Sequence, residues 1–336
     1  MTRIATAQLG TSGPEVGIQG LGCMGMSWAY GPTDADEARA TLERALELGV
    51  TLFDTADVYG SGENEKFLAP FLAAHREEVV LATKYSLTID PQDPSRRTIR
   101  NDPAYIRQSI EGSLGRLGVE AVDLYYMHRR DVNVPIEESV GAMAELVREG
   151  KVKHLGLSEV TAGELRAAQE VHPIAAVQSE WSLFSRDIER AVVPAAAELG
   201  VALVPYSPLG RGFLTGSFVN AEKDLSQDDF RRTQPRFTGD NAAANAALLA
   251  PLHEIAKARS ASAGQIALAW VQQRAQVHGL TVVPIPGTRK RSRVEENTEA
   301  TRLVLTAEEL AALEPLAGEV AGERYADMSF TSAGRD

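Results

Sequence analysis

The chain contains a single cysteine, Cys23, among its 336 residues, and only six histidines. One cysteine cannot form an internal disulfide, and it cannot build a cysteine-based metal site. Of the six histidines only His128 falls at the end of a predicted strand. A disulfide-stabilised fold is therefore excluded. A metal-dependent barrel enzyme, an isomerase or a hydrolase, remains an alternative that metal analysis of the purified protein would decide.

Long hydrophobic runs and an excess of positive charge are also missing. No apolar run approaches the ~20 residues that a membrane span needs, and the first residues lack the pattern of a secretory signal. The chain has 34 basic and 46 acidic side chains, a net charge of −12. This balance disfavours nucleic acid and anionic membranes as partners, although it allows a local basic pocket for a phosphate. We expect a cytoplasmic protein whose partner is a small molecule, either as a monomer or as a homo-oligomer.

Short apolar strands alternate with amphipathic helices along most of the chain. The strands are predicted near Leu21, Leu52, Leu81, Leu124, Leu155, Val177, Leu203 and Val283. The helices are predicted at residues 34–48, 63–75, 102–117, 135–149, 161–171, 187–199 and 306–316. Strands separated by helices pair in parallel, and eight such units predict an α/β fold of the (β/α)8 TIM-barrel type. A doubly wound open sheet is the alternative, but no G-x-G-x-x-G motif opens a helix.

Three segments fall outside this alternation. Residues 6–18 place turn residues between apolar flanks and predict an N-terminal β-hairpin. Residues 218–245 form a long polar stretch after strand seven, which predicts a functional loop. The tail at 322–336 has no periodicity, and it is expected either to drape over the barrel mouth or to be disordered. No linker divides the chain, so residues 1–336 are expected to form one domain.

Ionisable side chains stand where several predicted strands end. Asp54, Lys84 and His128 end the second, third and fourth strands, and Tyr59 lies on the loop after the second. Because barrel enzymes carry their chemistry at the carboxyl ends of the strands, these four side chains are expected to share one mouth. Asp57, on the same loop as Tyr59, is expected to lie in solvent, and the alternative is that it replaces Asp54 as the partner.

The four side chains suit proton transfer to a carbonyl oxygen. Lys84 is expected to lower the pKa of Tyr59, ordinarily about 10, by stabilising the phenolate. Asp54 would hold the buried lysine, and His128 would orient the reacting oxygen. Taken singly, Lys84 also fits a surface lysine and His128 a core histidine. Their shared placement at strand ends favours the catalytic interpretation, in which a cofactor supplies hydride.

These residues resemble the catalytic tetrad of the aldo-keto reductases. The tetrad is carried by Asp54-Thr55-Ala56-x-x-Tyr59, Lys84 and His128, and further segments match in order. Gly156–Ser158, Val177–Gln178, Tyr206–Gly210 and Ile285–Thr288 are similar to the segments after strands five to eight of this family. The last two segments look most like bacterial and plant members that have Pro-Gly-Thr at the cofactor clamp. The resemblance runs from the opening hairpin to about Leu316.

The resemblance implies NADPH-dependent reduction of aldehydes and ketones, with Tyr59 as proton donor. The cofactor-binding residues that it implies are Gly22, Met24, Asp54, Ser158, Gln178, Tyr206, Ser207, Leu209, Gly210, Gly212, Gly287, Thr288, Arg289, Arg293, Glu296 and Asn297. Better-known members have lysine where this chain has Gly287, but Thr288, Arg289 and Arg293 can grip a 2′-phosphate, so NADPH is favoured over NADH. The expected substrate pocket comprises Trp28, Tyr30, Tyr59, Tyr85, His128 and Arg129. A cofactor-sensing regulatory subunit with little turnover is the alternative function.

Overall fold

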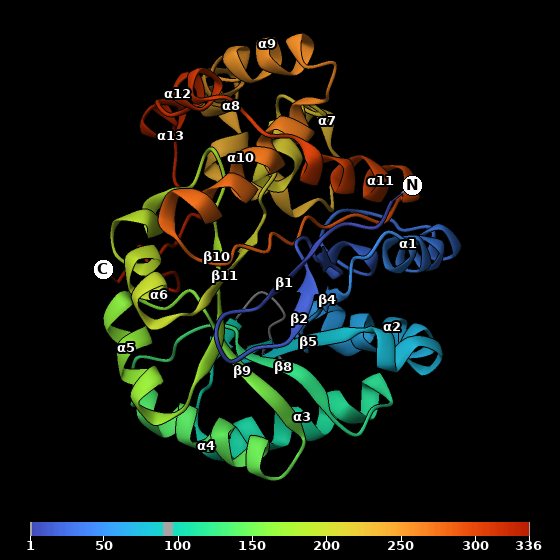
Figure 1. The fold of residues 1–336 in the computed structure, drawn as a ribbon, viewed down its shortest axis with the longest axis vertical. Helices are drawn as coiled ribbons and strands as arrows, with labels where there is room; N and C mark the ends of the chain where they lie inside the picture. The colour runs from blue at the N-terminus through green and yellow to red at the C-terminus, as the bar shows by residue number, and fades with distance from the viewer. Residues whose placement is uncertain (1, 90–96, 336) are drawn as a thin grey trace.

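The computed structural model describes residues 2–89 and 97–335. Its centre is a parallel sheet whose strands follow one another in the order of the chain. These strands are β3 (Leu21–Gly22), β4 (Leu52–Asp54), β5 (Val80–Tyr85), β8 (Val122–Met127), β9 (Val152–Ser158), β10 (Ile174–Glu180) and β11 (Ala202–Tyr206). In Figure 1 the helices surround these strands.

Residues 281–285 fill the eighth position of the barrel. On one side, the Leu203 amide donates to the Thr281 carbonyl, and the Val283 amide donates back to the Leu203 carbonyl, both at 2.9 Å. On the other side, the Gly20 amide beside β3 donates to the Pro284 carbonyl at 2.9 Å. The segment therefore joins the first and the last strands of the sheet. The prediction of a (β/α)8 TIM barrel is confirmed.

The predicted N-terminal hairpin closes the bottom of the barrel. Strands β1 (Thr6–Gln8) and β2 (Glu15–Gly17) pair antiparallel. Leu9 and Val16 pack into the cluster of apolar side chains that fills the barrel interior, together with Leu52 from β4. The opposite end, at the carboxyl ends of the strands, is thereby left as the accessible mouth.

The first six helices cover the outside of the barrel and follow the apolar periodicity of the sequence. They are α1 (Ala35–Glu47), α2 (Glu63–His75), α3 (Pro103–Leu117), α4 (Ile136–Arg148), α5 (Ala162–Val171) and α6 (Val192–Leu199). Local signals fix their ends: Thr161 and Glu164 form a capping box at the start of α5, and Gly118 ends α3 with a φ of 68°. The helix predicted at 187–199 is divided into a 3-10 turn (Asp187–Arg190) and α6.

The region after β11 is more helical than predicted. Residues 218–245 include α7 (Ala221–Asp224) and most of α8 (Gly239–Ala247), and they are followed by α9 (Ala250–Ala258) and α10 (Ala263–His278). Neither α9 nor α10 was predicted. Helix α10 has buried side chains around most of its circumference, so its sequence lacks the polar stripe that marks a surface helix. Helices α7 to α10 gather at one side of the barrel with α11 (Arg291–Glu299), α12 (Ala307–Leu313) and α13 (Leu316–Glu319) (Figure 1).

One further feature differs from the sequence predictions. A second hairpin, β6 (Leu87–Ile89) with β7 (Arg97–Ile99), follows β5 and was not predicted. Over residues 322–335 the tail packs over the barrel mouth, which is one of the two expected alternatives. Arg324 is 2% exposed and forms an ion pair with Glu159 at the end of β9. No helix in the described ranges is long and apolar enough to span a membrane.

Candidate active site

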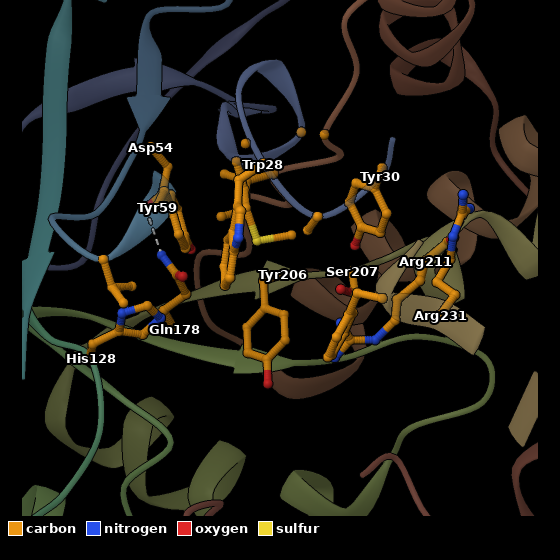
Figure 2. Close-up of a pocket in the computed structure, with 18 of the residues that line it drawn as sticks. Trp28, Tyr30, Asp54, Tyr59, His128, Gln178, Tyr206, Ser207, Arg211 and Arg231 are labelled. Carbon is orange, nitrogen blue, oxygen red and sulfur yellow. Dashed lines mark hydrogen bonds between the residues drawn. The ribbon is translucent and has the colours of Figure 1, made fainter. Parts of the chain in front are cut away.

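Three strand ends and the loop after one of them bring the predicted tetrad together. Lys84 Nζ donates a short hydrogen bond to Asp54, donates to the Thr55 carbonyl at 2.8 Å, and lies 3.4 Å from the Tyr59 hydroxyl. The rings of Tyr59 and His128 meet edge to face, with centroids 5.8 Å apart. Figure 2 shows Asp54, Tyr59 and His128 at one end of the cavity.

Burial and neighbouring charges act against each other on this group. Burial alone would lower the pKa of Lys84, but the Asp54 carboxylate and Tyr59 outweigh it, so the pKa is raised and the ammonium stays charged. Burial raises the pKa of Tyr59, and Lys84 only opposes that shift. The expectation that Lys84 lowers the phenol's pKa below its usual value is therefore wrong for this state. The phenol stays protonated, which is the form that a proton donor needs.

A cavity of about 930 Å³ extends from this group across the barrel mouth. Its lining includes Tyr59 and His128 of the tetrad, and also Thr288 and Asn297 from the segment after the eighth strand position and from α11. Of the expected cofactor residues, those that line it are Gly22, Met24, Asp54, Gln178, Tyr206, Ser207, Leu209, Gly212, Gly287, Thr288, Arg289, Arg293 and Asn297. The cavity therefore connects the tetrad with the start of α11, as an extended dinucleotide requires.

Three of the expected cofactor residues do not line this cavity. Ser158 is fully buried, and its hydroxyl accepts a hydrogen bond from Arg129 Nη1 at 3.2 Å. Gly210 is buried at the start of the 3-10 turn (Gly210–Thr215) that follows β11. The Glu296 carboxylate accepts a hydrogen bond from the Ser262 hydroxyl at the start of α10. Ser158 and Glu296 thus have partners within the protein, where the sequence resemblance implied contacts to the cofactor.

Arg289 also has a different environment from the expected one. Its guanidinium donates to the carbonyls of Tyr30 and Gly31 at 2.8 and 3.0 Å and to the Thr33 hydroxyl at 3.0 Å. These bonds fix the loop after β3, so this guanidinium is already engaged with the protein. Arg293, by contrast, is exposed and lines the cavity. It is the better placed of the two arginines for a phosphate.

The expected substrate residues divide into a group on the cavity wall and one exception. Trp28, Tyr30, Tyr59, His128 and Arg129 line the cavity. The ring of Trp28 stacks on Tyr59 with centroids 5.9 Å apart, as Figure 2 shows. Tyr85 does not line it: the residue is fully buried, and its hydroxyl donates to Met143 Sδ at 3.4 Å. Successive side chains on a strand point to opposite faces, so Tyr85 faces the helices because Lys84 faces the barrel interior.

Gln178 lies at the tetrad end of the cavity, and Tyr206 lies between the two ends shown in Figure 2. Gln178 Nε2 donates to Asp54 Oδ2 at 2.8 Å, which connects β10 to the tetrad (Figure 2). The Tyr206 hydroxyl donates to Glu159 Oε1 at 2.7 Å, which fixes the ring below the cavity. Arg211 and Arg231 lie at the other end of the view.

The structure adds residues that the sequence reasoning did not identify. Arg211, Arg231, Tyr325 and Phe330 line the cavity, and Glu159 lies beneath it. Burial alone would raise the pKa of Glu159, but Arg324 and then Arg129 outweigh it and hold the pKa at about 2. The position of Glu159 directly after Ser158 at a strand end could have revealed it. The aperiodic tail gave no such signal for Tyr325 or Phe330.

A metal centre has no support in the described part of the chain. Within residues 2–89 and 97–335, no group of three or more histidine, cysteine, aspartate or glutamate side chains is placed to hold a metal ion. The ionisable groups at the mouth are instead joined to one another, as Lys84 is to Asp54. The geometry fits proton transfer by protein side chains.

Comparison with known proteins agrees with this geometry. The sequence model of the Aldo/keto reductase family matches residues 20–317. The chain belongs to the aldo/keto reductase family. Among solved structures, this aldo/keto reductase is similar to a glycerol dehydrogenase from Gluconobacter oxydans, with 30% identity, a TM-score of 0.83, and 96% and 98% of the two chains covered.

Two other aldo-keto reductases are similar over comparable lengths. One, from Bacillus halodurans and determined in its holo form, is 26% identical with a TM-score of 0.74, and the match covers 97% of this chain and all of the other. A thermostable member determined with the inhibitor epalrestat is 28% identical with a TM-score of 0.72 and covers 93% of this chain. Family membership makes this chain an oxidoreductase of carbonyl compounds.

Proposed function

We propose that this aldo/keto reductase reduces aldehydes and ketones to alcohols with NADPH, and that Tyr59 donates the proton. The observation that carries the proposal is the placement of Lys84 Nζ between Asp54 and the Tyr59 hydroxyl, at 3.4 Å from the latter. A charged ammonium at this distance stabilises the phenolate that forms as the proton leaves. The positive charge that stabilises the phenolate is therefore already in place when the proton leaves Tyr59.

Each tetrad residue has a role that follows from its contacts. Tyr59 holds the proton at its hydroxyl, and its ring edge faces His128 across the cavity wall. His128 positions the carbonyl oxygen next to that hydroxyl. Asp54 keeps Lys84 charged, and Gln178 holds the second carboxylate oxygen of Asp54. A bound nicotinamide cofactor supplies the hydride.

The decisive variant for this proposal is Tyr59→Phe. It removes the transferable proton while keeping the ring that packs on Trp28. We expect turnover of a reactive aldehyde to fall about 10²–10⁴-fold, the usual contribution of a positioned acid. NADPH binding, followed by fluorescence titration, should change little.

Tyr85→Phe is the matched control for this variant. It deletes the same atom from a tyrosine that lies next to Lys84 in sequence but faces the helices, away from the cavity. Its turnover should remain within a few-fold of the parent enzyme. Full activity in Tyr59→Phe would disprove the proposed role. Absence of turnover across an aldehyde and ketone panel, together with a stable protein partner, would favour the regulatory-subunit alternative.

The preference for NADPH is proposed to come from Arg293, near the start of α11. The side chain is exposed and lines the cavity, as Thr288 and Asn297 also do, and arginine suits a phosphate dianion. We expect Arg293→Ala to raise the Kd for NADPH about tenfold, the effect of one charge-assisted contact. The Kd for NADH should change little.

Arg291→Ala is the control for this titration. Arg291 belongs to the same helix, but its guanidinium is held by Glu37 at 2.8 Å. Its removal should leave the NADPH-to-NADH ratio unchanged. An equal rise in the Kd for NADPH and the Kd for NADH in Arg293→Ala would show that this residue does not recognise the 2′-phosphate.

A further inference from the structure

Arg129 brings a buried positive charge to the cavity wall directly after His128. The residue is 6% exposed and lines the cavity. Its Nη1 donates to the His128 carbonyl at 2.7 Å and to the Ser158 hydroxyl at 3.2 Å. Its Nε is buried and has no hydrogen-bond partner among the described residues. The guanidinium therefore keeps donor capacity that the protein does not use.

The other buried arginines near the cavity each have a carboxylate partner. Arg211 pairs with Glu180 at 3.3 Å, Arg130 pairs with Glu164 at 3.4 Å, and Arg324 pairs with Glu159 at 3.1 Å. Within the described ranges no such pair holds Arg129.

Glu159 is the carboxylate with the strongest electrostatic effect on Arg129, but its oxygens are already engaged. Oε1 accepts from Arg324 and Tyr206, and Oε2 accepts from Arg324 and the Ser332 amide. A buried guanidinium without a bonded anion is unfavourable unless a ligand provides one. The Arg129 guanidinium therefore gains a directly bonded counter-charge only when an anion binds in the cavity.

Aromatic rings hold the guanidinium close to the reacting group. Its carbon lies 5.7 Å from the ring centroid of Phe330 and 5.9 Å from that of Tyr206. These rings limit the directions in which Arg129 can move and keep it partly desolvated, which strengthens any contact with an anion. The charge of Arg129 also acts on the Tyr59 phenol, so the two groups belong to one local site.

We propose that Arg129 binds a carboxylate of the substrate, so that the preferred substrates are short oxo acids. The inference rests on the proposed carbonyl reduction. The substrate carbonyl faces Tyr59 and His128, while its carboxylate takes the open donors of the guanidinium, a geometry that arginine favours. The carbonyl carbon gains a hydride from the reduced nicotinamide, which is oxidised. The carbonyl oxygen gains the proton of Tyr59, and a hydroxy acid is released.

The test compares acids with their neutral esters. The probes are 4-oxobutanoate and glyoxylate, each beside its methyl ester, with NADPH at saturation. The parent enzyme should show a higher kcat/KM for the acid in at least one pair. In Arg129→Met the acid-to-ester ratio for that pair should fall about tenfold to a hundredfold, mainly through KM, since a hydrogen bond to a charged group is lost. Arg129→Lys should restore part of the ratio because it restores the charge.

Arg130→Met is the control, because it removes a neighbouring arginine that already has Glu164 as partner. Its ratio should equal that of the parent enzyme. A parent enzyme that prefers both esters, or an unchanged ratio in Arg129→Met, would overturn the inference. An equal fall in both arginine variants would overturn it as well. These outcomes leave the proposed function intact as long as the esters are reduced and Tyr59→Phe abolishes their reduction. Should Arg129→Met prove insoluble, the parent preference and Arg129→Lys decide the question.

Discussion

Asp54 and Asp57 lie three residues apart, but the barrel wall places them in opposite environments. Asp54 ends β4 and points into the mouth, where Lys84 and Gln178 bond its two oxygens. Asp57 belongs to the loop that follows and points outward, towards α3, where Ser109 donates to its Oδ2 at 2.8 Å. Both carboxylates are withdrawn from water, but among the described residues only the first has a cation bonded to it.

The outer environment leaves Asp57 incompletely satisfied. Its Oδ1 is buried without a hydrogen-bond partner among the described residues. The neighbouring cation, Arg116, is bonded to Glu65 at 2.6 Å, and Glu65 also accepts from Thr83. Burial, opposed by Ser109 and reinforced by Glu65, raises the pKa of Asp57 to about 7. The expectation that Asp57 lies in solvent is therefore wrong.

The two aspartates show what a bonded cation supplies to a buried carboxylate. In the mouth, the ion pair between Asp54 and Lys84 offsets the cost of burying both groups and holds the ammonium beside Tyr59. In the outer layer, Asp57 lacks such a partner among the described residues, so burial raises the pKa of this carboxyl to about 7, close to the loop that carries Tyr59.

Removing the cation from the inner site should have the largest effect. Lys84→Met leaves Asp54 buried without its ion-pair partner, and breaking a buried pair in this way costs about 3–5 kcal/mol. We expect the urea midpoint to fall accordingly and aldehyde turnover to be lost, because Tyr59 loses the charge that stabilises its phenolate. Chemical unfolding and steady-state assays of the same preparations measure both effects.

A second variant separates the two consequences. Asp54→Asn/Lys84→Met removes both charges together, so part of the lost stability should return while turnover stays absent. Equal stability of the single and double variants would contradict the view that an unpaired Asp54 is what destabilises Lys84→Met. A Lys84→Met enzyme as stable as the parent would contradict it more directly.

Much of this arrangement follows from the sequence, because it depends on strand order. Alternating strands and helices predict the barrel, and parallel strands in a barrel bring their carboxyl ends to one mouth. Asp54, Lys84 and His128 therefore meet around Tyr59, even though the first and the last are 74 positions apart. No contact between distant side chains had to be known in advance.

The errors have the opposite cause, since each depends on which neighbour a side chain meets. Tyr85 was assigned to the cavity, although a shift of one residue from Lys84 turns it to the other face of β5. Arg324 pairs with Glu159 across 165 residues, and no local pattern in the tail marks that contact. Asp57 looks like any acidic loop residue until the position of α3 is known. Helix α10 was missed because its neighbours bury most of its surface.

Replacing the outer aspartate should have a smaller and pH-dependent effect. The folded-state pKa of Asp57, about 7, exceeds the ordinary value of 3.8. Between these values the unfolded chain has released a proton that the folded protein retains, so stability falls as pH rises from about 4 to about 7 and is level above that.

Asp57→Asn mimics the protonated acid and lacks this slope. We expect its advantage over the parent to grow by of order 2–3 kcal/mol between pH 5 and pH 8. The measurement is the urea midpoint at both pH values, with Asp36→Asn on the exposed face of α1 as the control that leaves the slope unchanged. If parent and Asp57→Asn lose stability in parallel between pH 5 and pH 8, Asp57 does not titrate in this range. The contrast with Asp54 would then rest on hydrogen bonding alone.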